Sequence, residues 1–261
     1  MRKSGAVRKF ARLKEILAPM DKCLVAFSAG TDSSFLLRAA RDALGKNVLA
    51  VTAASEFFPA SETAAARRLA KKMRVRHLVL DFKPPQAFWD NTGQRCYICK
   101  KAMMRKLCSI ARRERIAFVL DGSNADDLID DRPGRKALRE LGIRSPLEEA
   151  GFTKREIRLL SRSMGLPTWD KEPLSCLATR VASGSKITQG KLKMVGRAES
   201  CLRKLGVRAV RVRHHGPLAR IETDARGFPL IVKDREMISR CLRRLGFVQV
   251  TVDLAGCCRG Q

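Results

Sequence analysis

The chain has 261 residues, enough for a medium domain followed by a small one, and we expect two units. Its 53 lysines and arginines against 26 acidic residues give a formal net charge of +27, which favours anionic partners such as phosphorylated small molecules or nucleic acid. No apolar run approaches the ~20 residues that cross a bilayer, and no signal-peptide pattern opens the chain. We therefore expect a soluble, cytoplasmic protein, without a membrane partner, whose 9 cysteines are reduced.

Short apolar segments alternate with segments of helical spacing in the first part of the chain. The strand-like segments are 23–28, 48–53, 77–82 and 117–122, and the helical segments between them are 33–44, 61–73 and 96–114. Near-continuous apolar strands that alternate with helices indicate a parallel sheet covered on both faces. The pattern predicts an α/β domain over residues 1–183.

Residues 153–156, Thr-Lys-Arg-Glu, fit a capping box. Thr153 can accept a hydrogen bond from the amide of Glu156 while the Glu156 side chain reaches back to the start of the helix. The motif predicts a helix that begins here and continues to about Met164.

Residues 184–261 have a different sequence pattern, in which two helical segments are similar to each other. Each ends in Cys-Leu-Arg-(Lys or Arg)-Leu-Gly and is followed by an alternating strand, and a further strand lies between the two copies. The helical segments are 188–205 and 234–245, and the middle strand is 218–223. We expect a small antiparallel α+β domain in which Cys201 and Cys241, at matching apolar positions, lie in the core.

The sequence Phe-Ser-Ala-Gly-Thr-Asp-Ser-Ser at 27–34 lies between the first strand and its helix. Backbone N–H groups and the dipole at a helix start favour an anion there, and Gly30 allows close approach. The hydroxyls of Ser28, Thr31, Ser33 and Ser34 add donors. The loop suits a pyrophosphate, although it lacks the Walker A and dinucleotide patterns and an ordinary helix cap is about as plausible from the loop alone.

The run Ser-Ala-Gly-Thr-Asp-Ser is similar to the Ser-Gly-Gly-x-Asp-Ser signature of the PP-loop ATP pyrophosphatases, which have the adenine nucleotide alpha hydrolase-like fold. These enzymes cleave ATP between the α and β phosphates and adenylylate a substrate. The resemblance implies that ATP contacts Ala26, Ser28, Gly30, Thr31, Asp32, Ser33 and Ser34. It also implies that Asp32 is catalytic and binds Mg²⁺. Ala29 departs from the signature glycine, and a positive φ there would strain the loop by about 1 kcal/mol or more.

A second motif, Asp-Gly-Ser-Asn-Ala-Asp-Asp at 121–127, follows the fourth strand. Gly122 permits a turn at the carboxyl edge of the sheet, where ligands of open α/β sheets bind. Asp126 and Asp127 face Mg²⁺ or a ribose in one interpretation, and form a turn plus a helix cap in the other. Together with the loop, the motif places Gly122 and Asp127 in the predicted nucleotide site.

Four further stretches resemble the LarE family of ATP-dependent sulfur transferases, which make the nickel-pincer nucleotide cofactor of lactate racemase. They are residues 95–100, 141–158, 171–180 and 211–222. The resemblance implies that ATP adenylylates a carboxylate of a pyridinium mononucleotide and that a sulfur nucleophile displaces AMP. Cys176 stands at the family's sulfur-donor position, and in the sacrificial version it is left as dehydroalanine.

The source of the sulfur has two interpretations. Lys171 and Arg180 flank Cys176 and favour the thiolate that must attack, although position alone favours a buried structural cysteine. Alternatively, Cys96 and Cys99 together with Cys176 hold a [4Fe–4S] cluster whose fourth iron carries sulfide, or the pair simply lines a helix interface. Cys108 is expected in the core, and Cys257 and Cys258 are either accessory ligands or incidental.

Arg211 and Arg213 fall on one face of an alternating strand, where two guanidiniums can clamp a phosphate. An exposed basic face is the alternative for either arginine alone. The adjacent His214 and His215 point opposite ways, so at most one faces a site. The resemblance assigns this region, with Glu199 and Arg259, to substrate binding.

Two other functions fit the phosphate loop and the basic charge. A tRNA thiolase would use the same loop, but an aromatic content of 5% and a single tyrosine weaken RNA binding as the main function. A basic nucleotide- or RNA-binding protein disabled by Ala29 is the non-enzymatic alternative. We also expect a homo-oligomer, because the second domain offers sheet edges for pairing between copies.

Overall fold

A computed structural model describes residues 2–128, 133–172 and 175–256. The chain forms two compact units. The first comprises Met1–Ser55, Ala60–Phe88 and Gln94–Pro173, and the second comprises Glu56–Pro59, Trp89–Gly93 and Leu174–Gln261. The division falls earlier in the chain than the boundary predicted at 183/184, so Cys176 lies in the second unit.

The first unit is built on a 4-stranded parallel sheet in the order β3-β2-β1-β4. Its strands are β1 (Cys23–Ala26), β2 (Val48–Ala54), β3 (Arg76–Asp81) and β4 (Phe118–Leu120). All three neighbouring pairs run parallel. The predicted α/β class with a parallel sheet is confirmed.

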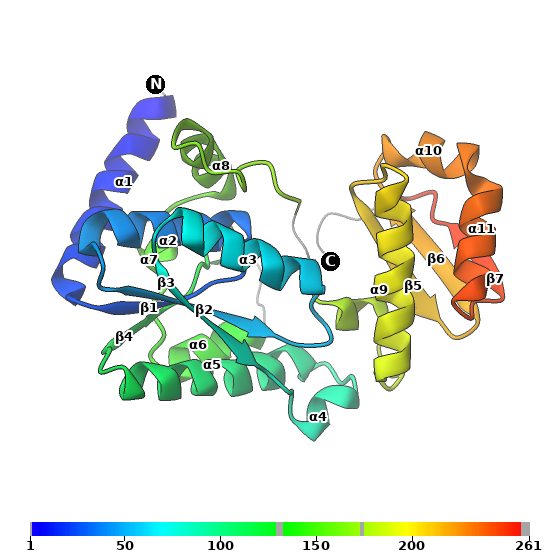
Figure 1. The fold of residues 1–261 in the computed structure, drawn as a ribbon, viewed down its shortest axis with the longest axis horizontal. Helices are drawn as coiled ribbons and strands as arrows, with labels where there is room; N and C mark the ends of the chain where they lie inside the picture. Colours follow the sequence, from blue (N-terminus) through cyan, green and yellow to red (C-terminus); the bar gives the residue numbers. More distant parts are fainter. Residues whose placement is uncertain (1, 129–132, 173–174, 257–261) are drawn as a thin grey trace. The chain divides into compact units, whose positions relative to one another are not determined.

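Alternate side chains along the strands belong to two separate cores. Val25 and Ala50 join one apolar cluster, whereas the neighbouring Leu24 and Leu49 join the other. Figure 1 shows α1, α2, α3 and α8 on one face of this sheet and α5 and α6 on the other. Burial on both faces explains why the strands are nearly continuous apolar runs.

The helices of this unit are α1 (Arg2–Leu17), α2 (Thr31–Leu44), α3 (Ala60–Lys72), α5 (Arg95–Arg113), α6 (Pro133–Glu140), α7 (Pro146–Glu149) and α8 (Lys154–Ser163), with the short turns η1 (Ala18–Met20) and η2 (Ala125–Leu128). α4 (Gln86–Trp89) links the units. The capping box of α8 is present, with Thr153 and Glu156 bonded to each other's backbone amides. The predicted helix 153–164 is therefore confirmed.

Cys108, half-buried on α5, packs against the apolar cluster of that face, and burial raises the pKa of its thiol.

The second unit contains a 3-stranded sheet in the order β5-β6-β7. Its elements are η3 (Leu177–Arg180), α9 (Gln189–Lys204), β5 (Val210–His215), β6 (Leu218–Thr223), α10 (Gly227–Lys233), α11 (Arg235–Arg244) and β7 (Gln249–Val252). β5 and β6 are antiparallel, but β6 and β7 are parallel. The prediction of an antiparallel sheet is therefore wrong for β7, because the α10–α11 crossover returns the chain to the same end of the sheet.

α10 was missed in the sequence because Pro229 and Gly227 are poor helix formers. Gly227 is required by packing, since a Cβ there would lie 2.0 Å from Thr223 Oγ1. Cys201 and Cys241 lie half-buried on α9 and α11, so the expected core position is only partly reached; burial and the neighbouring Cys241 raise the pKa of the Cys201 thiol to about 11. In the described part of the chain, no helix combines the length and the apolarity that crossing a membrane requires.

Candidate functional site

The phosphate loop occupies the turn between β1 and α2, the two elements at the centre of the first unit. After β1 the chain forms β2, which pairs along one edge of β1, whereas β4 pairs along the other edge. The strand order therefore reverses at β1. Open α/β sheets bind ligands outside the carboxyl ends of the strands at such a reversal. The loop follows Ala26, the last residue of β1, and the helix begins at Thr31.

Ala29 adopts a left-handed backbone conformation with φ of 54°. Ala29 is only 1% exposed and belongs to the apolar cluster on this face of the sheet, so its methyl group is buried. The signature glycine of the PP-loop enzymes tolerates this conformation, whereas alanine is strained by about 1–2 kcal/mol. The positive φ on which the expected strain depends is therefore present, and the strain itself stays a prediction.

Replacing Ala29 with glycine should relieve this strain. We expect the free energy of unfolding to change by less than about 1 kcal/mol, because the relieved strain offsets both the entropy that glycine adds to the unfolded chain and the loss of a buried methyl group. Urea unfolding measures the change. Ala43→Gly, within α2, is the matched control and should lower the free energy of unfolding by about 1 kcal/mol. A loss of stability in Ala29→Gly as large as that in Ala43→Gly would contradict the strain at Ala29.

The hydroxyls of Ser28, Ser33 and Thr31 form contacts that hold the loop in shape, whereas the hydroxyl of Ser34 does not. Ser28 Oγ lies 3.1 Å from Ser33 Oγ and accepts a hydrogen bond from the Gly30 amide at 3.3 Å. Thr31 Oγ1 donates to the Thr168 carbonyl at 2.8 Å. Ser34 Oγ is buried and has no hydrogen-bond partner among the residues that the structure describes. The loop is thus held in shape by its own side chains, with one buried donor available for a ligand.

Asp32 lies in the first turn of α2 with one carboxylate oxygen paired and one unpaired. Oδ2 accepts a hydrogen bond from Lys154 Nζ, whereas Oδ1 is buried and finds no partner in the described part of the chain. Burial raises the pKa of Asp32, Lys154 opposes this rise, and the nearby Asp127 adds to it. A buried carboxylate oxygen without a partner beside a second carboxylate is suitable for Mg²⁺, which binds through one or two carboxylates and the phosphates of a substrate.

The motif at 121–127 lies against the start of α2, as the sequence predicts. A Cβ on Gly122 would lie 3.1 Å from Ser33 N, so the two chain segments pass in close contact. Burial of Asp121 acts to raise the pKa of its carboxyl, but Lys100 Nζ at 2.7 Å and hydrogen bonds from Ser123 together outweigh it and lower that pKa. Asp126 accepts from the Lys154 amide at 2.8 Å, and Asp127 accepts from the Asn124 amide at 3.0 Å. Both aspartates therefore form turn and cap contacts here.

Replacing Gly122 with alanine should displace the start of α2. The added methyl group would lie 3.1 Å and 3.2 Å from the backbone N and Cα of Ser33, which cannot rotate away. We expect a loss of about 1–3 kcal/mol in the free energy of unfolding and weaker nucleotide binding. Thermal unfolding and calorimetric titration with ATP measure the two effects. The control is Gly93→Ala, where a Cβ meets nothing within 4 Å; equal losses in both variants would argue against this contact.

Lys171 and Thr168 attach a later segment to the same loop. Lys171 Nζ donates to the Ala29 carbonyl at 3.0 Å and pairs with Glu62 at 2.6 Å. Thr168 accepts from Thr31 through its carbonyl, while its own Oγ1 is buried and unpaired. Residues 168–171 are therefore anchored on the phosphate loop within the first unit.

In the second unit, Cys176 lies half-buried immediately before η3. Its carbonyl accepts hydrogen bonds from Thr179 Oγ1 at 2.7 Å and from Thr179 N at 3.0 Å. Thr179 Oγ1 accepts in turn from Arg180 at 2.8 Å, and the Thr179 carbonyl accepts from Arg213 at 2.7 Å. Thr179 thus fixes the turn that presents Cys176.

Two buried or half-buried ion pairs hold those arginines. Glu199, 1% exposed, accepts from Arg180 Nε at 2.6 Å and from Arg203 at 2.7 Å. Arg213 binds Glu222 through two hydrogen bonds of 2.8 Å and 3.0 Å. Glu199 and Arg213 are thereby connected to the Cys176 turn through side chains rather than open to solvent.

Comparison with known proteins places the chain in a family. It is 40% identical over 95% of its length to the pyridinium-3,5-bisthiocarboxylic acid mononucleotide synthase of Lactiplantibacillus plantarum, covering 91% of that protein. This chain belongs to the LarE family. It is also 38% identical to an uncharacterized protein of Synechocystis over 95% of this chain and 94% of that protein. An uncharacterized protein of Methanocaldococcus jannaschii is 32% identical over 63% of this chain and 64% of its own length. No family model matches the chain.

The LarE assignment confirms the family predicted from the sequence, and the structure brings several predicted site residues together. Arg211 and Arg213 share one half-buried face of β5, while His214 is buried and His215 exposed, as the alternation predicts. Arg259, Cys257 and Cys258 lie outside the described residues.

The predicted three-cysteine iron–sulfur set finds no support in the described residues. Cys96 is exposed and Cys99 half-buried in the first turns of α5. Across residues 2–128, 133–172 and 175–256, no group of three His, Cys, Asp or Glu side chains is arranged to hold a metal ion.

Sequence reasoning missed Lys154, Thr179 and Glu222. Lys154 was visible only as a member of the capping box, and its partner Asp32 lies 122 positions away. Thr179 and Glu222 fell inside the family-like stretches, but nothing local distinguishes a positioning residue from its neighbours.

Proposed function

We propose that this chain is an ATP-dependent sulfur transferase that converts a carboxylate of a pyridinium dicarboxylate mononucleotide into a thiocarboxylate. The observation that carries the proposal is the 40% identity, over 95% of the chain, to a protein named for the bisthiocarboxylic product. The phosphate loop at the strand reversal and the cysteine turn braced by Thr179 provide the two sets of groups that such a reaction needs.

The reaction begins at the phosphate loop. The amides at the start of α2 and the unpaired hydroxyl of Ser34 bind the phosphates of ATP, which is a substrate. A substrate carboxylate attacks the α-phosphorus, pyrophosphate leaves, and an acyl adenylate forms. Asp32 would hold a Mg²⁺ ion through its carboxylate, and the ion would supply neutralisation of phosphate charge. Adenylylation is needed because a carboxylate oxygen is a poor leaving group.

Sulfur transfer follows at Cys176. Its thiolate attacks the acyl carbon, AMP leaves, and a thioester joins the substrate to the protein. Loss of the Cys176 α-proton with cleavage of its Cβ–Sγ bond then releases the thiocarboxylate and leaves dehydroalanine. Each chain therefore supplies one sulfur atom by this route.

The decisive experiment is the intact mass of anaerobically purified protein before and after incubation with ATP, Mg²⁺ and the pyridinium substrate. The proposal expects pyrophosphate release and the loss of one H₂S equivalent at Cys176. An unchanged mass together with broad visible absorption from iron would instead indicate a cluster-bound sulfide. Absence of pyrophosphate release with this substrate would refute the proposed function.

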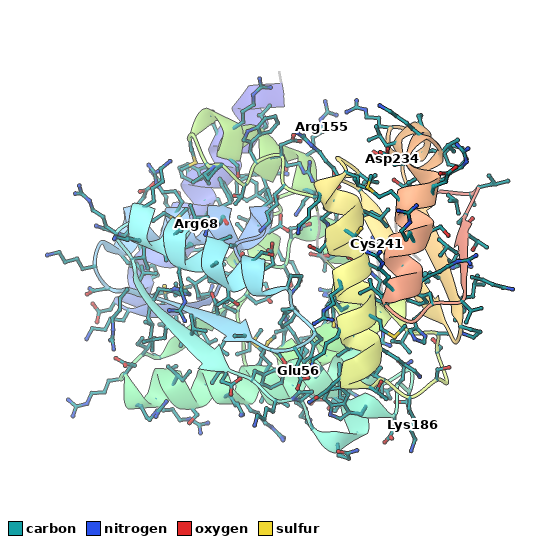
Figure 2. All side chains as sticks on the ribbon, turned by 45° about the vertical axis from the view of Figure 1, so that its right-hand side comes forward. Glu56, Arg68, Arg155, Lys186, Asp234 and Cys241 are labelled. Carbon is teal, nitrogen blue, oxygen red and sulfur yellow. The ribbon has the colours of Figure 1, made fainter. Side chains whose placement is uncertain are left out.

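A tRNA thiolase is the second candidate, and the net charge of +27 is the observation that favours it. Figure 2 shows nitrogen-tipped side chains spread over both units rather than gathered on one element. Pyrophosphate release that depends on tRNA would support this alternative. Self-association also stays a proposal, and it rests on β5 and β7, which each pair only with β6 among the described strands.

A further inference from the structure

Lys154 carries a positive charge at the N-terminus of α8, where the helix dipole is also positive. It is the first residue of α8, and Thr153 is the N-cap. The start of a helix carries partial positive charge, so a lysine there is unfavourable unless something else holds it. Its ammonium group is held by Asp32, in the first turn of α2. Glu156 and Asp126 accept hydrogen bonds from the amides at this helix start, whereas the ammonium group pairs with a carboxylate on another helix, so capping of α8 does not account for that ion pair.

Packing between α2 and α8 does not depend on this ion pair. Phe35 of α2 and Phe152, just before α8, meet edge to face with ring centroids 5.3 Å apart. Ile157 of α8 is fully buried in the same apolar cluster. The side chains of Lys154 and Asp32 retain 32% and 23% of their exposure. A partly exposed ion pair contributes little to stability, so its position beside the phosphate loop needs another explanation.

Several positive and negative groups converge on Asp32. Lys154 bonds to Oδ2 while Oδ1 is buried and unpaired, and the charges of Asp127 and Arg158 also act on the carboxylate. The fit of this carboxylate to a divalent cation rests on that unpaired oxygen. A divalent cation and an ammonium group on one small carboxylate repel each other, so the two compete for it.

We propose that Lys154 is the resident counter-ion of the phosphate loop, which holds Asp32 when the loop is empty and transfers to a phosphate of the nucleotide when a divalent cation takes Asp32. The inference rests on the proposed use of ATP. Lysine suits the exchange because its ammonium is a compact charge on a flexible stem. Lys154 is a binding residue in this scheme, and it sets how much divalent cation the loop requires.

The test measures the affinity for α,β-methylene-ATP, which is not cleaved at the reacting bond, over a range of MgCl₂ concentrations by calorimetry. In Lys154→Met, binding at saturating MgCl₂ should weaken about ten- to a hundredfold, because a charge-assisted hydrogen bond to phosphate is lost. The MgCl₂ concentration that gives half of the maximal increase in nucleotide affinity should fall several-fold, because Lys154 no longer competes with the divalent cation for Asp32. Lys154→Arg should keep most of the affinity, since the charge remains.

Arg155→Met is the matched control. Arg155 is the next residue in the same turn of α8, is exposed, and carries the same charge (Figure 2). Its replacement should leave the nucleotide affinity at saturating MgCl₂ and the half-effect MgCl₂ concentration close to those of the unchanged chain. Lys154→Gln serves as a second variant if the methionine variant does not fold, because glutamine keeps an N–H donor for Asp32 but no charge.

A measurement without nucleotide separates this inference from the proposed function. MgCl₂ alone should raise the thermal midpoint of Lys154→Met or Lys154→Gln more than that of the unchanged chain. That result in a chain that binds no nucleotide would refute ATP use but support the competition at Asp32. An unchanged half-effect concentration and an equal response to MgCl₂ in all variants would overturn the role of Lys154.

Discussion

Replacing Cys176 with serine should abolish thiocarboxylate formation while pyrophosphate release persists. The loss is expected to be complete because the sulfur of Cys176 is itself an atom of the proposed product. Adenylylation needs the phosphate loop of the first unit, whereas Cys176 lies in the second unit, in the turn fixed by Thr179. Product mass spectrometry and a pyrophosphate assay, run on the same samples, measure the two steps separately.

Cys108→Ser is the matched control. Cys108 is also half-buried, but it lies on α5 and belongs neither to the phosphate loop nor to the turn fixed by Thr179. It should keep both activities. Thiocarboxylate formed by Cys176→Ser would show that sulfur enters from another source, and the same assay on Cys96→Ser would then test the cysteine pair at the start of α5. Loss of pyrophosphate release in Cys176→Ser would contradict the separation of the two steps.

The parts of this protein that sequence could predict are encoded locally. Strand β1 is a buried apolar run, the loop from Ser28 to Ser34 has its residues in one stretch, and the box from Thr153 to Glu156 closes over four positions. In each case the pattern and the structure concern neighbouring residues. The 40% identity over nearly the whole chain shows why the family could also be predicted from short motifs.

The parts that sequence could not predict depend on contacts between distant residues. Lys154 meets Asp32 across 122 positions, and Arg213 meets the Thr179 carbonyl across 34. The direction of β7 depends on how α10 and α11 cross the sheet, which alternation along one strand does not encode. Side chains at such positions have ordinary neighbours, so their partners emerge only from the fold.

Replacing Glu199 with alanine should strongly destabilise the second unit. Glu199 and Arg180 are 1% and 3% exposed, and the carboxylate also accepts from the Val212 amide at 3.2 Å. Removing the carboxylate leaves the Arg180 guanidinium buried without its partner, and arginine cannot lose its charge. We expect a loss of about 3–5 kcal/mol in the free energy of unfolding, measured by urea unfolding of the full chain. Such a loss is a large share of the stability of a typical domain.

Two comparison variants separate the buried charge from the binding role predicted for Glu199. Arg203→Met removes a partner whose side chain is 30% exposed and should cost less than about 1 kcal/mol. Arg180→Met combined with Glu199→Leu removes both buried charges and should recover much of the lost stability. Because Arg180 also bonds to Thr179, this double variant should stay slow in sulfur transfer although it is folded. A stable double variant with full activity would show that the ion pair supports the fold alone, whereas a stable Glu199→Ala would show that Arg180 does not need its carboxylate.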